Sequence, residues 1–240
     1  MNLILLNAAD FVDDETVRLQ GRPFDHVAQV LKKEEGAMLR VGQVDGAIGY
    51  GTIVHRDHQQ LTLQVRLDQP PPPPLNLRLI LALPRPKMLR RILQGVASLG
   101  VKKLYLVNSY RVDKSYWNSP LLRPENLDEQ LRLGLEQAGD TILPKVVLRP
   151  RFKPFVEDEF PELCRNLDAY IAHPGADHAC PPSSSAPRLL AVGPEGGFIP
   201  YEVEKMQACG AVPVHLGPRI LRVETALPVL IAKLTSQKES

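Results

Sequence analysis

The sequence of 240 residues lacks several features that would define its class at once. It has only three cysteines, Cys164, Cys180 and Cys209, without a Cys-x-x-Cys pair, so we expect reduced, mostly structural thiols. No hydrophobic run reaches the length of a membrane span, and Met1–Asn7 is too short and lacks the basic flank of a signal peptide. These absences predict a soluble cytoplasmic protein with no membrane partner.

Charge and catalytic motifs are equally sparse. The net charge of +2 does not by itself indicate nucleic-acid binding. The six histidines have no metal-ligand spacing on a common helix, so no metal site is predicted. Neither a Gly-x-Ser-x-Gly elbow nor a Gly-x-x-x-x-Gly-Lys-Ser/Thr loop occurs, which argues against a serine hydrolase and against a nucleotide-hydrolysing enzyme.

Two glycine- and proline-bearing segments near the C-terminus are the most informative feature that is present. Gly193-Pro194-Glu195-Gly196-Gly197 and Leu216–Ala226 each follow an apolar run and each precede a helical pattern. A strand, a glycine loop and a helix together place free backbone N–H groups around one crevice, which suits a nucleotide-like cofactor. The alternative is that the glycines only make tight turns.

The rest of the chain predicts two domains joined by a proline spacer. Pro70–Pro74 is a stiff linker, and residues 1–69 contain short alternating runs typical of a small β-barrel or sandwich. After it, residues 75–240 alternate strands with helices, which predicts a parallel sheet covered by helices. The predicted strands are 77–83, 103–107, 145–148, 168–172, 188–192 and 212–216, and the helices are 86–98, 127–138, about 200–209, and one capped by Thr225 and running through Leu234 with Pro228 in its first turn. The stretch 174–187, rich in Ser and Pro, is predicted to be a mobile loop.

Basic residues gather after the linker and are candidates for RNA contact. Arg78 and Lys103 belong to this gathering, and the candidates themselves are Arg85, Lys87, Arg90, Arg91, Arg111 and Lys114. Their alternative role is a solvated helix face. Tyr110, Tyr116 and Trp117 could stack unpaired bases, although such aromatics more often belong to a core or a dimer interface.

The two loops resemble a known family. Gly193-Pro194-Glu195-Gly196-Gly197-Phe198, followed by Leu216-Gly217-x-Arg219-x-Leu221-Arg222-x-Glu224-Thr225-Ala226, is similar to the cofactor loops of the SPOUT methyltransferases, and most similar to those of the 16S ribosomal RNA uracil-N3 methyltransferases. The resemblance implies an α/β domain with a deep trefoil knot, preceded by a PUA-like β-barrel that helps to hold RNA. It also implies bound S-adenosyl-L-methionine and a homodimer whose cofactor site lies against the partner subunit.

The resemblance also assigns residues. The cofactor-binding residues that it implies are His173, Gly193, Pro194, Glu195, Gly196, Leu216, Gly217, Leu221, Arg222, Glu224, Thr225 and Ala226. Uracil N3 carries a proton at neutral pH, so a base or a stabilising cation must help it leave. Arg222 and Glu195 are the catalytic candidates, with Arg222 stabilising charge because arginine cannot act as a neutral base. Glu224 could instead pair with Arg219 or Arg222 to hold the loop.

The chain departs from the family pattern at Gly95, Ser98 and Asp140, where family members commonly carry lysine, glutamate and arginine respectively. The cofactor loops are complete, so cofactor binding is better supported than the identity of the methylated nucleotide. The leading function is methylation of N3 of a uridine in small-subunit ribosomal RNA. The alternatives are methylation of another RNA site and a non-catalytic RNA-binding scaffold.

Overall fold

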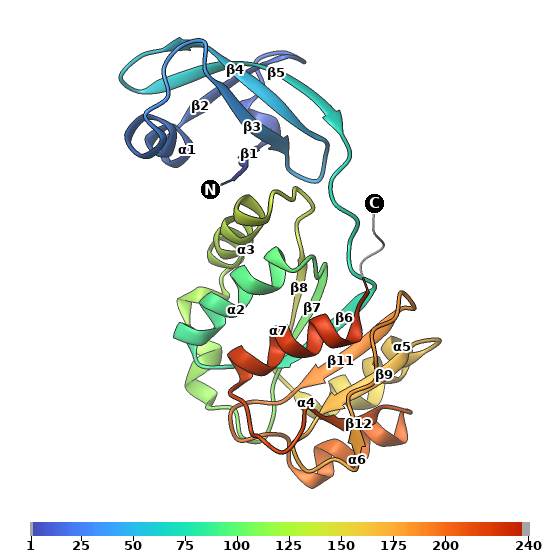
Figure 1. Cartoon of the computed structure of the whole chain (residues 1–240). Coiled ribbons are helices and arrows are strands. Elements are labelled where there is room, and N and C mark those ends of the chain that lie inside the picture. Colours follow the sequence, from blue (N-terminus) through green and yellow to red (C-terminus); the bar gives the residue numbers. More distant parts are fainter. Residues whose placement is uncertain (1, 237–240) are drawn as a thin grey trace. The chain divides into compact units, whose positions relative to one another are not determined.

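The computed structural model describes residues 2–236 and divides the chain into two compact units (Figure 1). Unit 1 comprises the chain up to Pro73 together with Arg132–Leu143, and unit 2 comprises Pro74–Leu131 and the chain from Pro144 onwards. The sequence did not indicate that residues 132–143 belong to the first unit. The assignment of residues 1–69 and 75–240 to separate domains stays a prediction.

Unit 1 is built on a five-stranded, mostly antiparallel sheet in the order β1-β3-β4-β5-β2. Its elements are β1 (Ile4–Leu6), β2 (Thr16–Gln20), α1 (Arg22–Asp25) continued by a π-helical turn (His26–Leu31), β3 (Met38–Gln43), β4 (Ile48–Arg56) and β5 (Gln60–Gln69). Alternate residues such as Leu61, Leu63 and Val65 point into an apolar core, which the short helix closes with Phe24 and Val27. This curled sheet agrees with the predicted PUA-like barrel.

Close approach of strands makes one glycine of unit 1 irreplaceable. A β-bulge separates Ile48 from Gly49, and a Cβ atom at Gly49 would lie 1.8 Å from the carbonyl oxygen of Arg66.

The end of α3 also belongs to this unit, where Arg22 donates to both carboxylate oxygens of buried Glu136 at 2.9 and 2.5 Å. A bidentate guanidinium satisfies that carboxylate away from water.

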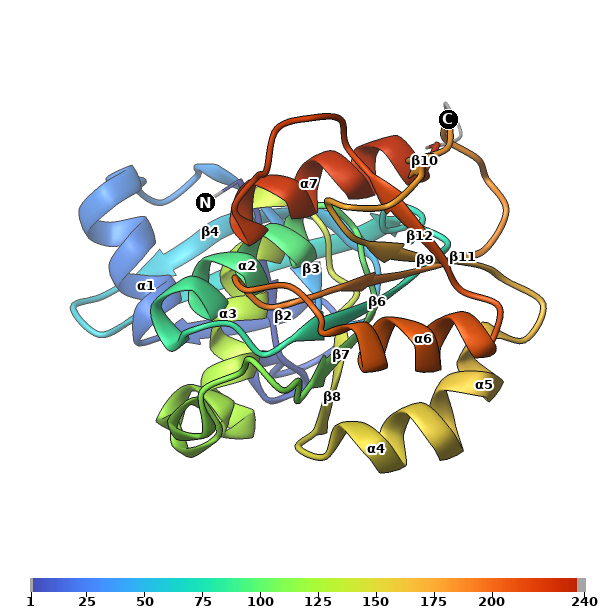
Figure 2. The ribbon, with the colours of Figure 1, turned by 90° about the horizontal axis from the view of Figure 1, so that it is seen from below.

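Unit 2 holds a seven-stranded parallel sheet in the order β10-β12-β9-β11-β6-β7-β8. Its strands are β6 (Leu77–Ala82), β7 (Lys103–Val107), β8 (Lys145–Arg149), β9 (Asp168–Ala172), β10 (His178–Ala179), β11 (Arg188–Val192) and β12 (Val212–His215). Its helices are α2 (Pro86–Ser98), α3 (Pro124–Ala138, shared with unit 1), α4 (Phe152–Pro154), α5 (Phe160–Cys164), α6 (Pro200–Ala208) and α7 (Val223–Leu234). Figure 2 shows α2 and α7 on one face of this sheet and α4, α5 and α6 on the other. The predicted α/β fold with a parallel sheet is confirmed, whereas the trefoil knot stays a prediction.

Two local predictions are wrong. Helix α7 begins at Val223 with Arg222 as its N-cap residue, so Thr225 lies inside the first turn and does not cap the helix. Pro228 therefore lies in the helix interior, where it removes the N–H that would bond to the carbonyl of Glu224. The stretch 174–187 is not a loop throughout, because β10 pairs with β12 and Ser184 bridges Thr235.

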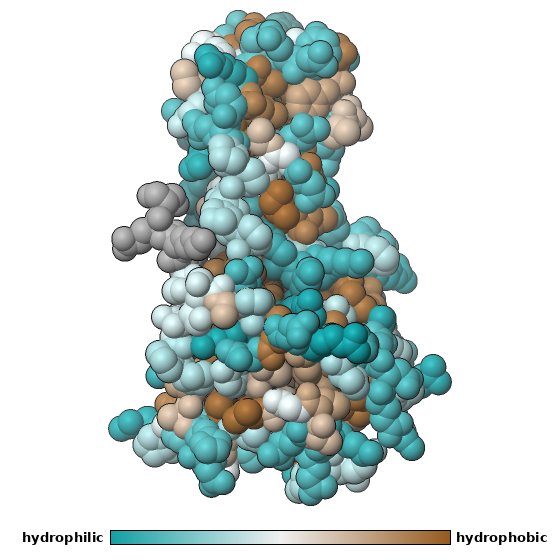
Figure 3. Space-filling view, turned by 90° about the vertical axis from the view of Figure 1, so that its right-hand side faces the viewer, coloured by the Kyte–Doolittle hydropathy of each residue, from teal (hydrophilic) through white to brown (hydrophobic). Residues whose placement is uncertain are grey.

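The thiols and the surface agree with the composition. All three cysteines are free, and burial raises the pKa of the Cys164 thiol to about 11, so this thiol stays protonated at neutral pH. Hydrophilic residues cover most of the face drawn in Figure 3, and the hydrophobic ones form small, separate patches there. Within residues 2–236, no helix is both long enough and apolar enough to cross a membrane.

Candidate cofactor and RNA site

A cavity of unit 2, about 660 Å³ in volume, opens at the carboxyl ends of three neighbouring parallel strands. His173 directly follows β9, Gly193 follows β11 and Leu216 follows β12, and all three line the cavity. Because the carboxyl ends of parallel strands share one edge of a sheet, residues far apart in the sequence meet there. The volume is that of a site for a small organic molecule.

Most of the predicted residues converge on this cavity. The predicted cofactor residues among its lining are His173, Gly193, Pro194, Glu195, Leu216, Gly217, Leu221, Arg222, Glu224 and Ala226. Gly196 and Thr225 do not line it; Gly196 instead accepts a hydrogen bond through its carbonyl from the Arg111 guanidinium. Among the predicted RNA contacts, Arg85, Lys87 and Arg91 line the same cavity, whereas Arg90, Arg111 and Lys114 do not.

The first glycine loop is a tight turn that leaves no room for a side chain at Gly193. A Cβ atom at Gly193 would lie 2.9 Å from the backbone nitrogen of Phe198, and the Gly197 N–H donates to the Pro194 carbonyl at 2.7 Å. In the second loop, Gly217 has a φ of 109°, which side chains rarely adopt, and its N–H donates to Nδ1 of His215 at 2.9 Å. The glycines therefore shape the cavity walls as well as making turns.

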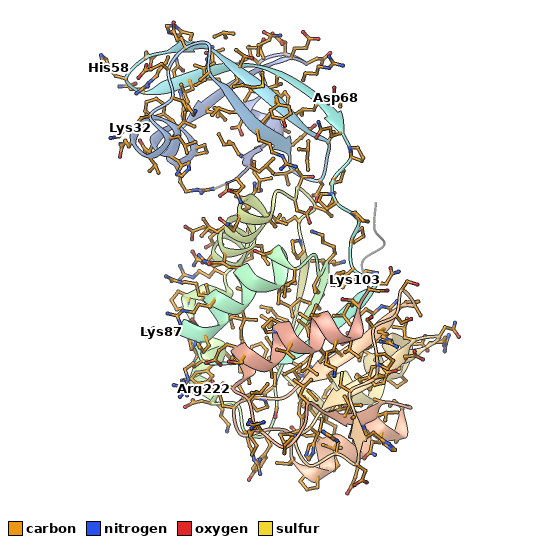
Figure 4. All side chains as sticks on the ribbon, in the orientation of Figure 1. Lys32, His58, Asp68, Lys87, Lys103 and Arg222 are labelled. Carbon is orange, nitrogen blue, oxygen red and sulfur yellow. The ribbon has the colours of Figure 1, made fainter. Side chains whose placement is uncertain are left out.

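Charged side chains of both signs surround the opening. The Arg85 Nε lies 3.2 Å from Oε1 of Glu195, and both side chains are exposed enough to meet a ligand. Arg85 and Arg222 are the N-cap residues of α2 and α7, so the positive ends of two long helices are directed at the cavity. Figure 4 shows Lys87 and Arg222 on the same side of unit 2.

Glu224 lines the cavity without the partners that the sequence suggested. No ion pair joins it to Arg219 or Arg222 in the described part of the chain. Its carboxylate is therefore available to a ligand, as is the guanidinium of Arg222.

Several residues of the site are not predicted by the sequence. The missed lining residues include Met88, Val192, Val214, His215, Arg219 and Leu230. The buried carboxylate of Glu202 is not predicted either; it accepts hydrogen bonds from the Ser109 hydroxyl at 3.1 Å and the Tyr110 N–H at 2.8 Å. These bonds hold the loop after β7 against the start of α6. An acidic residue in the first turn was visible in the sequence, but its partners lie more than 90 positions away.

Comparisons with known proteins agree with this geometry. Residues 71–235 match the family described as the RNA methyltransferase domain. A curated relative, ribosomal RNA small subunit methyltransferase E of Treponema pallidum, is 30% identical over 94% of this chain and 87% of its own length. The chain belongs to this RNA methyltransferase family. The family resemblance predicted from the two loops is thereby confirmed.

Solved structures share the fold of the family. The ribosomal RNA small subunit methyltransferase E of Neisseria gonorrhoeae, solved bound to S-adenosyl methionine, has a TM-score of 0.79 at 21% identity and covers 97% of this chain and 95% of its own. A Legionella pneumophila methyltransferase solved with the same cofactor has a TM-score of 0.70 at 23% identity and covers 96% and 97%. Within residues 2–236 of this chain, no group of three or more potential ligands could hold a metal ion.

Proposed function

We propose that the protein transfers a methyl group from S-adenosyl-L-methionine to N3 of a uridine in small-subunit ribosomal RNA. The observation that carries this proposal is the single cavity that brings together both glycine loops and the cations Arg85, Lys87 and Arg91. Family membership and the names of the relatives support the reaction class and the substrate. Because ribosomal RNA is the substrate, the proposed location is the cytoplasm.

The residues present fit this cofactor. Apolar side chains of Ala172, Val192, Val214 and Leu230 provide surface for an adenine ring, and the glycine loops provide backbone groups for the ribose. Glu195 and Glu224 provide carboxylates for the cationic groups of the cofactor. When bound, S-adenosylmethionine supplies an electrophilic methyl group on its sulfonium. We assign His173, Gly193, Pro194, Leu216, Gly217, Leu221 and Ala226 to its binding, with Gly196 and Thr225 supporting the loops.

The protein's own residues position the base and accept the proton that leaves N3. Methyl transfer requires nitrogen, carbon and sulfur in line, so holding the base in place contributes much of the rate. Glu195, oriented by Arg85, is the candidate to accept the N3 proton, and Arg222 stabilises the uracil anion. Arg85, Lys87 and Arg91 then hold RNA phosphates at the cavity, and Arg90, Arg111 and Lys114 extend that surface.

The decisive test uses small ribosomal subunits from cells that lack the protein. Incubation with labelled S-adenosylmethionine, followed by nucleoside mass spectrometry, is expected to show N3-methyluridine in the small-subunit RNA. A different methylated nucleoside would indicate another RNA site, and cofactor binding without transfer would favour the scaffold. Subunits that already carry the modification are the matched control and should accept no label.

We also propose that the protein is a homodimer through the surface formed by the second glycine loop and α7. Ile220, Leu221 and Val229 are 81%, 37% and 40% exposed, which is costly for an apolar group in water. A second copy that covers them would also close the cavity, because Ile220 and Leu221 line it. In this assembly, residues 1–69 act as the RNA-holding domain and residues 75–240 as the methyltransferase domain.

Charged side chains introduced into this apolar surface should separate the two copies of the proposed dimer. Ile220→Asp combined with Val229→Asp is expected to give a monomer by sedimentation at micromolar concentration, whereas the unchanged protein sediments as a dimer. Val30→Asp is the control, because Val30 is 66% exposed in unit 1 and lies outside the proposed surface. A monomeric unchanged protein would rule out the dimer.

A further inference from the structure

Three cations lie side by side at the amino ends of strands β6, β7 and β8. Arg78 is in register with Lys103, and Lys103 is in register with Lys145. Residues in register on neighbouring strands are about 4.8 Å apart and point to the same face of the sheet. We call these three residues the cation row.

The cation row lines a second cavity of unit 2, of about 350 Å³. Its other lining residues include Arg149, Glu159 and Leu163. Glu159 is the only carboxylate among the described lining residues of this cavity and is engaged by Arg149, whose Nε lies 2.6 Å from Oε1. Arg78 donates to the Leu163 carbonyl at 2.8 Å, while no hydrogen bond or ion pair engages the ammonium groups of Lys103 and Lys145 among residues 2–236. The cavity therefore has an uncompensated positive charge.

Protection of a sheet edge against further strand pairing does not explain the cation row. Lysine on an edge strand prevents further strand pairing, and this could account for Lys145 on β8. Arg78 and Lys103 lie on β6 and β7, which are paired on both sides and have no free edge. Like charges directly opposite one another weaken a sheet, so a row of three lowers stability unless an anion offsets it.

The row is separate from the cofactor cavity. From Arg78 to Ala82 at the carboxyl end of β6 the strand rises about 13 Å, and Figure 4 shows Lys103 at the opposite end of the sheet from Lys87 and Arg222. One set of phosphate contacts is thus assigned to Arg85, Lys87 and Arg91 at the cofactor cavity. The cation row provides a second set. A folded RNA offers phosphates over such a distance, whereas one small anion does not.

We propose that the cation row binds backbone phosphates of the RNA substrate at a distance from the methylated base. This inference rests on the proposed function. Phosphate contacts fix the position of an RNA without reading its sequence, so the cation row adds affinity and orientation. It takes no part in the chemistry, because it lies far from the cofactor cavity.

Lysine footprinting tests the site in the unaltered protein. Acetylation of Lys103 and Lys145 by a water-soluble acylating reagent should slow when small ribosomal subunits are bound, while exposed Lys153 reacts as before. Inorganic tripolyphosphate in place of the subunits should not give the same protection. Protection by tripolyphosphate but not by the subunits would show a small-anion site and overturn the inference, and so would equal acetylation with and without subunits.

Charge-removing variants measure the contribution. Lys103→Gln with Lys145→Gln should weaken subunit binding about tenfold and reduce the slope of log affinity against log salt by about 1.4, the expectation for two phosphate contacts. Cofactor affinity and transfer rate at saturating subunits should not change. Lys153→Gln with Lys205→Gln removes the same charge outside both cavities and should leave the slope unchanged; equal slopes for the two double variants would overturn the inference. If the unchanged protein methylates the subunits, the proposed function stands in either case, whereas failure of the unchanged protein to bind or methylate them would overturn both.

Discussion

Arg222→Ala should lower kcat for methylation of small-subunit RNA by about 10²–10³-fold, the usual effect of removing one donor that stabilises a developing anion. The guanidinium is exposed, lines the cavity at the N-terminus of α7 and is not engaged by Glu224, so it can turn to a uracil whose N3 is losing its proton. Cofactor affinity, measured by calorimetry, should change little because backbone groups and apolar contacts dominate the predicted cofactor contacts. Arg222→Lys should recover part of the rate, since it keeps the charge but loses the planar pair of donors.

The pH dependence of the rate separates this role from a structural one. Raising the pH deprotonates more of the uracil in the substrate, so the rate of Arg222→Ala should rise more steeply with pH than that of the unchanged enzyme. A variant that is merely misfolded would show a uniform loss at every pH. Arg90→Ala is the matched control, because Arg90 lies on α2 outside the cavity and should affect only the RNA concentration that is needed. An unchanged kcat for Arg222→Ala would refute the proposed role.

Regular elements of unit 2 could be predicted closely because their signals are local. The strands Asp168–Ala172 and Arg188–Val192 are short, mostly apolar runs between turn residues, and the structure has them with the predicted bounds. Helix α2 also begins and ends as predicted, with Pro86 at its first position. The glycine loops made the edge of the sheet where the cavity lies predictable, because glycine at a strand end indicates close approach of the backbone.

Features that depend on distant partners could not be predicted. Strand β10 is only His178 and Ala179, which is too short to form an apolar run, and it exists because β12 lies beside it. Threonine is a good N-cap residue, so the sequence favours Thr225 as the cap of α7, but the preceding loop ends earlier and Arg222 takes that position with no side-chain cap. The tie between Glu202 and Ser109 likewise appears only in three dimensions.

Arg188 is such a residue, and it holds the far end of the helix that carries Arg222. It begins β11, is 7% exposed, and donates from Nη1 to the carbonyls of Pro182 at 2.7 Å and Leu234 at 2.8 Å. Leu234 is the last residue of α7, so a buried cation meets the negative end of that helix. The guanidinium also lies 5.5 Å from the centre of the Tyr170 ring. The Arg188 side chain thus joins the loop that contains Pro182, strand β11 and the end of α7.

Arg188→Ala should lower the free energy of unfolding of unit 2 by about 3 kcal/mol, because two charge-assisted hydrogen bonds and the packing of the aliphatic stem are lost together. Removing the guanidinium also removes the cost of burying a cation, so the loss of unfolding free energy is smaller than the sum of those contributions. Urea unfolding measures the change, and hydrogen exchange of the backbone amides near the end of α7 should quicken first. The control is Arg165→Ala, whose exposed ion pair with Glu162 should contribute less than about 1 kcal/mol. If the two variants unfold at the same urea concentration, Arg188 does not fasten the helix, and the orientation of Arg222 at its other end must depend on the glycine loop alone.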